Sequence, residues 1–208
     1  MDLVYTQVKQ TKPQEKIDAL MRWKKSVGEK KAQEIVTEDA SRGPRMHKYL
    51  EDYITEGVLN EPGTNPYSVQ SHKMAKHIIE NGLKNVDEVW GVEVPLYYPG
   101  LYAGTSDGCG LHLNDESILD YKQTNKPKKE EWIEDYYLQL TAYALAHNEV
   151  HGTNIRKGVV LMCVSPKLNE QLVMVEEPKY QEFILKPEDF NYWERRWWDR
   201  VEQYYSQN

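Results

Sequence analysis

The chain has 208 residues, of which 39 % are hydrophobic, 11 % aromatic and 28 % charged, so it can bury a core and is not expected to be intrinsically disordered. No stretch approaches the roughly 20 apolar residues that cross a membrane, and the first residues lack the apolar core of a secretory signal. The two cysteines, Cys109 and Cys163, are too few for a disulfide framework, a four-cysteine zinc site or a four-cysteine iron–sulfur cluster.

The net charge of −7 is unevenly distributed along the chain. Residues 1–50 carry 11 Lys or Arg against 7 Asp or Glu, whereas residues 51–208 carry 15 against 26. A basic N-terminal region beside an acidic body can guide a phosphate backbone towards a carboxylate-lined site, but a solvated helical face explains the same pattern. The overall acidity argues against tight binding to long duplex DNA. It is compatible with an enzyme whose acidic site holds metal.

In chain order, the pattern predicts helices, then an antiparallel meander, then a helix and further strands. Residues 1–28 are predicted to form a polar N-terminal arm, and residues 29–208 a single domain. The predicted helices are 29–39, 44–56, 67–80, 132–148 and 187–203, with Gly43-Pro44 separating the first two. The predicted strands are 88–98, 101–113, 116–123, 157–165 and 171–176. This order indicates an α/β fold with a mixed central β-sheet flanked by helices.

Two neighbouring predicted strands carry the most informative residues. Asp120 and Lys122 project from the same face of one strand while Tyr121 points away, and the hairpin brings Asp107 alongside them. Paired carboxylates suit a divalent cation, because hard ions such as Mg²⁺ prefer oxygen ligands. The lysine can orient or help to deprotonate a metal-bound water and stabilise charge that grows on a phosphate. Taken alone, the Asp-x-Lys spacing also occurs by chance as a surface ion pair.

Two pairs of residues flank this constellation, and each pair is four residues apart on a predicted helix. The pairs are His47 with Glu51 and Gln139 with Tyr143. The order histidine, G-x-x-D (104–107), D-x-K (120–122) and Q-x-x-x-Y (139–143) resembles that of the RecB-like exonucleases of the PD-(D/E)XK nuclease superfamily. Within it, the sequence is most similar to the cluster-free mitochondrial genome maintenance exonuclease type, in which an aromatic residue follows the last aspartate. The similarity covers residues 43–143, about half of the chain.

This resemblance implies a restriction-endonuclease-like core and a metal-dependent active site. By the resemblance, one or two Mg²⁺ or Mn²⁺ ions would be held by His47, Asp107, Asp120 and the main-chain carbonyl of Tyr121. Asp107, Asp120 and Lys122 would be the catalytic residues.

The same resemblance suggests roles for further residues around the site. Gln139 and Tyr143 would bind the substrate backbone or brace the active site. Weaker candidates are Glu51 and Glu93, which stand where family members often have an acidic residue, and Lys126, Lys128 and Tyr136. The lysines follow the predicted site directly and can contact phosphates, although a solvated loop is the alternative. Tyr136 precedes Gln139 by three residues and is expected to share its helix face.

The sequence departs from the family pattern in two respects. Asp120 replaces the commoner glutamate, which keeps the charge but shortens the side chain and shifts the metal geometry. The four cysteines that hold an iron–sulfur cluster in many relatives are absent, so no such cluster is expected. A G-x-x-x-x-G-K-[ST] loop is also absent, so neither a nucleotide cofactor nor an ATP-driven motor is expected.

The expected function is a metal-dependent deoxyribonuclease, an exonuclease that hydrolyses phosphodiester bonds and prefers single-stranded DNA or free ends. DNA is the expected partner, no membrane is involved, and the expected compartment is the cytoplasm, of a bacterium or of the host of a phage. DNA repair and recombination use such nucleases. Alternatives are a duplex-end recombination exonuclease, an endonuclease or, in another class, a non-catalytic nucleic-acid-binding protein on a nuclease fold. The complete set of His47, Asp107, Asp120 and Lys122 favours an enzyme.

Overall fold

A five-stranded mixed β-sheet forms the centre of the protein. The structure is a computed structural model that describes residues 14–207. The strands of the sheet, in spatial order, are β1 (Val86–Tyr98), β2 (Tyr102–His112), β3 (Asp115–Thr124), β4 (Lys157–Val164) and β7 (Lys179–Leu185). The first three form the predicted antiparallel meander, β4 runs parallel to β3, and β7 runs antiparallel to β4. The prediction of an α/β fold with a mixed sheet is confirmed.

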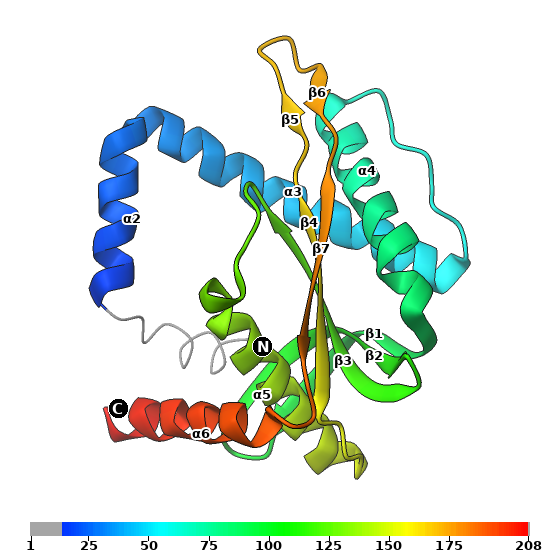
Figure 1. Cartoon of the computed structure of the whole chain (residues 1–208), viewed down its shortest axis with the longest axis vertical. Helices are drawn as coiled ribbons and strands as arrows, with labels where there is room; N and C mark the ends of the chain where they lie inside the picture. Colours follow the sequence, from blue (N-terminus) through cyan, green and yellow to red (C-terminus); the bar gives the residue numbers. More distant parts are fainter. Residues whose placement is uncertain (1–13, 208) are drawn as a thin grey trace.

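Helices cover both faces of this sheet (Figure 1). The helices are α2 (Gln14–Val27), α3 (Glu29–Glu56), α4 (Pro66–Asn81), α5 (Glu134–His151) and α6 (Phe190–Ser206), with short 3₁₀ turns at η1 (Leu83–Asn85) and η2 (Glu130–Trp132). Strand β4 is buried throughout, and its side chains alternate between two cores. Val160 and Met162 pack with residues of α5 and α6, whereas Val159 and Leu161 pack with residues of α3 and α4.

Helix α3 is continuous, so the prediction of two helices separated at Gly43-Pro44 is wrong. Proline inside a helix removes one backbone hydrogen bond and clashes with the preceding turn, at a cost of about 3 kcal/mol. Burial of the apolar side chains of Met46 and Leu50 on one side of the helix offsets that local cost. The continuity matters for the site, because it fixes the direction of His47 relative to the N-terminal half of α3.

The C-terminal strands also differ from the prediction. Only residues 174–176 of the predicted strand 171–176 are extended, as β6 (Met174–Glu176), which pairs with β5 (Lys167–Leu168) in a separate two-stranded sheet. The fifth strand of the main sheet is β7, which the sequence analysis missed. Its burial pattern is intermediate along most of its length, and Pro178 stands directly before it. The usual alternation signal is therefore weak.

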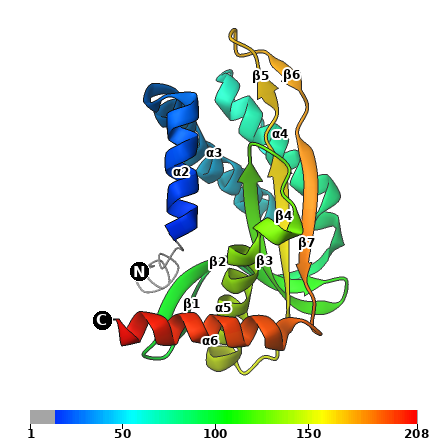
Figure 2. The same ribbon diagram turned by 60° about the vertical axis from the view of Figure 1, so that its left-hand side comes forward.

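The predicted polar arm 1–28 is helical where the structure describes it. Residues 14–27 form α2, which stands apart from the sheet and joins the N-terminal end of α3 at Gly28 (Figure 2). Residues 1–13 lie outside the described part. None of the helices described between residues 14 and 207 combines the length and the apolar character that a membrane crossing needs.

Candidate active site

The candidate site lies where β2 separates from β3. The antiparallel pairing of these strands extends from His112 opposite Asp115 to Gly108 opposite Leu119. Beyond Gly108, β2 continues to pair with β1 as far as Tyr102 opposite Tyr98. The two strands therefore diverge at Asp107, directly beside the D-x-K motif. This fork brings side chains of β2 and β3 within reach of both α3 and α5, which pack against this part of the sheet.

The main chain of Tyr121 forms hydrogen bonds with the side chains of Asp107 and His47. Its N–H donates to Oδ2 of Asp107 at 2.6 Å, and its carbonyl accepts a hydrogen bond from Nε2 of His47 at 3.0 Å. Since a carbonyl can only accept, Nε2 of His47 carries a proton, and in the neutral ring the lone pair then lies on Nδ1. Metal-binding histidines commonly donate their second N–H to a carbonyl in this way. The Tyr121 carbonyl thus orients His47. The assignment of this carbonyl as a direct metal ligand stays a prediction.

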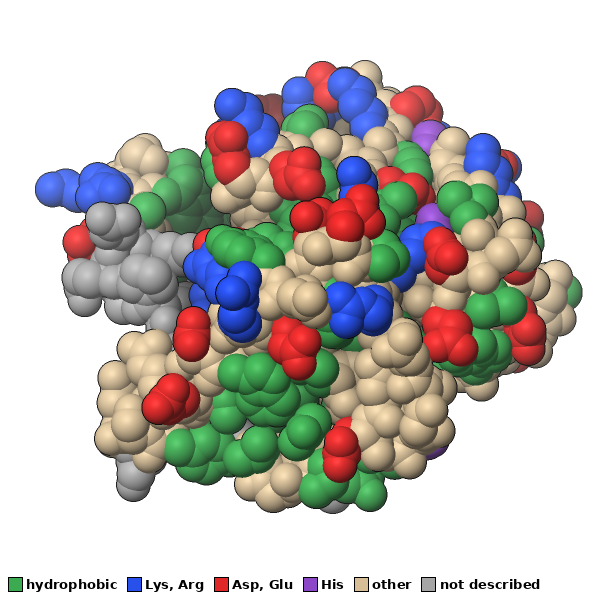
Figure 3. Space-filling model, turned by 60° about the horizontal axis from the view of Figure 1, so that its bottom comes forward, with side chains coloured by type: hydrophobic (Ala, Val, Ile, Leu, Met, Phe, Trp, Pro, Cys, Tyr) green, Lys and Arg blue, Asp and Glu red, His purple; other side chains and the backbone are tan. Residues whose placement is uncertain are grey.

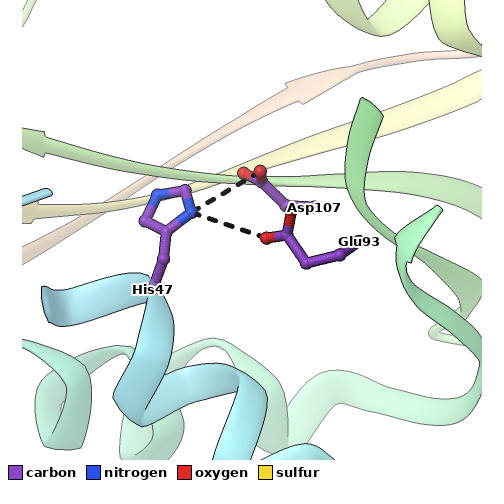
Figure 4. A group of neighbouring side chains, drawn as sticks. All are labelled: His47, Glu93 and Asp107. Atoms are coloured by element: carbon purple, nitrogen blue, oxygen red, sulfur yellow. Dashed lines mark ion pairs between the residues drawn. The ribbon is translucent and has the colours of Figure 1, made fainter. Parts of the chain in front are cut away.

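His47, Glu93 and Asp107 form a compact group of possible ligands, with one ligand atom from each residue lying within 4.8 Å of the others. Figure 4 shows the three side chains converging, with Nδ1 of His47 at 3.6 Å from Oδ1 of Asp107 and 4.0 Å from Oε1 of Glu93. His47 comes from α3 and the two carboxylates from neighbouring strands. An imidazole nitrogen and two carboxylates suit Mn²⁺ and, through the oxygens, Mg²⁺.

Glu93, a weaker candidate from the sequence, is positioned by an unusual backbone conformation. Its φ is +50°, in the left-handed region that non-glycine residues rarely adopt. It lies in β1 between the pairs Val92–Gly108 and Val94–Ser106, and therefore opposite Asp107. Such conformations cost of order 1–3 kcal/mol and cluster at functional sites. The backbone strain coincides here with the residue whose carboxylate completes the group.

Asp120 and Lys122 form a buried ion pair on the same strand, as the alternation predicts. The Lys122 Nζ lies 2.6 Å from Oδ1 of Asp120, and the Tyr136 ring centroid lies 5.5 Å from the same ammonium. The Asp120 side chain is 2 % exposed, whereas that of Lys122 is 21 % exposed. Oδ2 of Asp120 is buried and has no hydrogen-bond partner among the described residues. One oxygen of this carboxylate is thus left for a group that the protein itself does not supply.

The electrostatics of this pair favour an added cation. Burial, and then the nearby charge of Asp107, raise the pKa of Asp120 against the opposing effect of Lys122. Burial by itself lowers the pKa of Lys122, but the charges of Asp120 and Asp107 outweigh burial and raise it. The ammonium is therefore protonated at neutral pH, while the excess negative charge of the two aspartates is incompletely compensated. The residues whose ligand atoms lie close enough to share one cation are His47, Glu93 and Asp107. Asp120 is not part of that group, and its role as a metal ligand stays a prediction.

Gln139 and Tyr143 lie on α5, and Tyr143 contacts β2 at Gly104. Nε2 of Gln139 donates to the Tyr143 hydroxyl at 3.3 Å, and burial raises the pKa of Tyr143 to about 12. Oε1 of Gln139 is buried and without a hydrogen-bond partner in the described structure. The Tyr143 ring packs against Gly104, where an added Cβ would lie 2.8 Å from the ring. The glycine of the G-x-x-D motif is thus needed so that Tyr143 can approach β2.

The remaining candidates lie outside the group of His47, Glu93 and Asp107. Glu51 is on α3 and forms an ion pair with Lys48 at 3.9 Å. The backbone carbonyl of Lys126 accepts a hydrogen bond from Thr124, and the backbone of Lys128 forms two hydrogen bonds with the Gln181 side chain. These contacts order the segment after β3 and leave the roles of the lysine side chains as predictions.

Arg42 is a structural residue of the site that the sequence analysis did not identify. Its side chain is 1 % exposed and donates to Gln123 from Nε and to Asp39 and Asn125 from Nη2, each at 2.7 Å. Burial lowers its pKa despite these carboxylate and amide partners. Arg42 precedes His47 by five residues on α3, and Gln123 directly follows Lys122. The network therefore fixes α3 against the end of β3.

One face of the protein, drawn in Figure 3, carries both acidic and basic side chains, with hydrophobic side chains gathered in its lower part. No protein-family model matches the sequence, and a search of curated proteins finds no similar one.

Proposed function

We propose that this protein is a Mg²⁺- or Mn²⁺-dependent DNA exonuclease with a restriction-endonuclease-like core of the PD-(D/E)XK type. The observation that carries the proposal is the convergence of His47 and Asp107 on the peptide units of Tyr121, directly beside the buried Asp120–Lys122 pair. A bound Mg²⁺ or Mn²⁺ would supply positive charge for the phosphate and lower the pKa of water. Asp107 and Asp120, with His47 or Glu93, would hold that cation.

The protein residues contribute charge, orientation and shielding from solvent. Lys122 is held protonated by Asp120 and Asp107, so its ammonium acts by donating hydrogen bonds and stabilising negative charge that grows on a phosphate oxygen. A role for Lys122 as the proton-accepting base is disfavoured by the same raised pKa. Oε1 of Gln139 is available to accept a hydrogen bond from a water or a substrate group. Tyr143 keeps the Gln139 amide in place.

The proposed substrate is a single strand or a free end of DNA. The net charge of −7 disfavours long-range attraction of a duplex, because a duplex backbone presents two closely spaced rows of phosphates. A single strand needs only a narrow path to the fork. The basic N-terminal quarter of the chain, residues 1–50, includes α2 and would attract such a strand without requiring the acidic body to bind it.

A cleavage assay with end-labelled DNA tests the proposal. Single- and double-stranded oligonucleotides, labelled at the 5′ or the 3′ end, are incubated with Mg²⁺, Mn²⁺ or EDTA, and linear single strands are compared with closed circles. We expect metal-dependent shortening of linear strands only, and no cleavage by Asp120→Ala. Asp115→Ala is the matched control, because Asp115 lies on the same strand and its side chain is 62 % exposed.

The other outcomes separate the alternatives. Cutting of closed circles would identify an endonuclease, and shortening of duplex ends alone would identify a recombination-type exonuclease. Cleavage by Asp120→Ala at the wild-type rate would refute the residue assignment. Intact DNA under every metal, with folded protein that still binds DNA, would refute the enzyme and favour a non-catalytic nucleic-acid-binding protein.

A further inference from the structure

An exposed tryptophan stands on the segment that joins the two halves of the candidate site. Residues 125–133 connect β3, which carries Lys122, to α5, which carries Gln139. Trp132 in this segment is 58 % exposed, more than any other tryptophan in the described part of the chain. Exposing an indole to water is unfavourable, since a buried aromatic side chain removes 150–250 Å² from solvent. An exposed indole beside a site therefore calls for an explanation.

The segment that carries Trp132 is well anchored. The Lys128 N–H donates to Gln181 Oε1 at 2.8 Å, and the Lys128 carbonyl accepts from Gln181 Nε2 at 3.0 Å. The Trp132 N–H donates to the Lys129 carbonyl at 3.0 Å, and the next residue, Ile133, is fully buried. The ring is thus presented to solvent by an ordered backbone. Little conformational entropy would be lost when a ligand binds to it.

A basic side chain accompanies the ring. Nζ of Lys129 lies 5.3 Å from the centroid of the Trp132 ring, and the Lys129 side chain is 66 % exposed. Its ion pair with Glu131, at 3.7 Å, is solvent-exposed and contributes little stability. An aromatic ring next to an exposed ammonium matches the two parts of a nucleotide, because a base stacks on the ring and a phosphate pairs with the amine.

The position of Trp132 relative to Lys122 connects it to the fork. The Tyr136 ring, on α5, lies 5.5 Å from the Lys122 ammonium, and Trp132 ends η2 four residues before Tyr136. The Tyr136 N–H donates to the carbonyl of Ile133, so the two segments are joined without a flexible linker. Among the exposed aromatic side chains of the described chain, Trp132 is the one nearest to Lys122 in sequence.

We propose that Trp132 is a base-stacking residue for single-stranded nucleic acid at the rim of the active site, with Lys129 pairing with an adjacent phosphate. This inference rests on the proposed nuclease function and names a residue that would bind its single-stranded substrate. Bases inside a duplex are already stacked on both faces, so only an unpaired or terminal base can use the ring. The Trp132 ring would thereby select single strands over duplex interiors.

Binding measurements without cleavage test this inference. The anisotropy of a 5′-labelled 15-nucleotide single strand is titrated in EDTA with wild type, Trp132→Ala, Trp132→Phe and Trp90→Ala. Trp90 is the matched control, since it is the other exposed tryptophan of the described chain and lies beside His147 at the far end of α5. We expect about 5- to 100-fold weaker binding by Trp132→Ala, as for loss of one stacked base, and near-wild-type binding by Trp132→Phe and Trp90→Ala.

A second arm replaces single nucleotides by abasic ones along the strand. If Trp132 stacks a base, one or two abasic positions should weaken wild-type binding and leave Trp132→Ala unaffected. Equal binding by wild type and Trp132→Ala, in a protein that cleaves DNA, would overturn this inference alone. Equal sensitivity of both proteins to every abasic position would also overturn it. Wild type that neither binds nor cleaves DNA would overturn the proposed function and this inference together.

Discussion

Each end of β3 carries a lysine–aspartate ion pair, and the two pairs are buried in opposite ways. At the start of the strand, Lys157 is 8 % exposed and reaches out to Asp115, which is 62 % exposed. Near its end, Asp120 is 2 % exposed and Lys122 is the more accessible partner, at 21 %. The first pair leaves its carboxylate in water, where it is well solvated. The second pair removes its carboxylate from water, which is costly unless other charges compensate.

The surroundings strengthen this contrast. Lys157 also donates to the His112 carbonyl at 2.8 Å, so its ammonium is satisfied by two oxygen partners. Asp120 keeps one oxygen without a protein partner and stands near a second carboxylate, Asp107. Two ion pairs of the same composition can therefore differ in role. The pair at the start of β3 anchors the sheet, and the pair near its end is poised to accept a cation.

The largest effect is expected from the two aspartates. Asp120→Asn removes a proposed cation ligand and should slow single-turnover cleavage by on the order of 10³-fold, equivalent to several kcal/mol of charge stabilisation. Asp115→Asn should leave the rate within about two-fold, because surface ion pairs contribute little. Cleavage of an end-labelled oligonucleotide measures both. If Asp120→Asn and Asp115→Asn slow cleavage equally, the two ion pairs of β3 do not differ in role.

The two lysines should separate catalysis from stability. Lys122→Met is expected to lower turnover by about 10²-fold, as for loss of one donor to a developing charge, with little change in DNA affinity. Lys157→Met should leave turnover per folded molecule unchanged but lower the free energy of unfolding by about 1–3 kcal/mol, because the His112 carbonyl loses its lysine donor. Urea unfolding and single-turnover kinetics of each variant test this. A stable but inactive Lys157→Met would contradict it.

Substitution of two glycines, Gly104 and Gly63, tests the close contact between Tyr143 and β2. Gly104→Ala places a Cβ 2.8 Å from the Tyr143 ring and should destabilise the protein by about 1–3 kcal/mol through overpacking. Gly63→Ala is the control, since nothing lies within 4 Å of the Cβ it would add. Thermal unfolding of the two variants gives the comparison. If Gly104→Ala is as stable as Gly63→Ala, the close approach of Tyr143 to β2 is not needed.

The smallest effect expected is on the pH dependence of stability, through His112, which ends β2 opposite Asp115 at the start of β3. Burial, with a contribution from Lys157, lowers the pKa of His112, while Glu182, Asp87 and Asp115 act in the opposite direction. The unfolded chain, with a histidine pKa of about 6.5, therefore binds the proton more readily than the folded one. Stability should fall as pH drops from about 6.5 towards the folded pKa, by at most about 1.4 kcal/mol per pH unit for this group.

His112→Gln should flatten this slope in urea unfolding between pH 7.5 and pH 5.5. The imidazole is fully buried and neither ring nitrogen has a hydrogen-bond partner in the described chain, so the substitution removes a proton-binding group without breaking a side-chain hydrogen bond. An unchanged slope would assign the acid sensitivity to other groups. His147 is the next candidate, because burial and then His151 lower its pKa as well.

The sequence analysis succeeded where local patterns decide the structure. Turn residues and alternation predicted the meander and placed Asp120 and Lys122 on one face, because both signals act over a few residues. The predicted break at Pro44 was wrong, because packing of the neighbouring α3 residues Met46 and Leu50 in the core outweighs the local penalty of proline. The contribution of Glu93 depends on a positive φ, and the network of Arg42 joins residues more than 80 positions apart. Neither feature has a signature in the order of residues alone.

One consequence follows from the peptide units of Tyr121. The contacts that hold Asp107 and His47 use the N–H and the carbonyl, which every residue except proline provides. A mutational scan at position 121 would therefore report only the packing of the aromatic ring and miss this contribution. Replacing the amide of residue 121 by an ester, in a semisynthetic protein, would remove the N–H. The change in cleavage rate and stability would measure how much its hydrogen bond to Asp107 contributes. The side chains of His47 and Asp107 are thus positioned by backbone groups, whose contribution side-chain substitutions do not report.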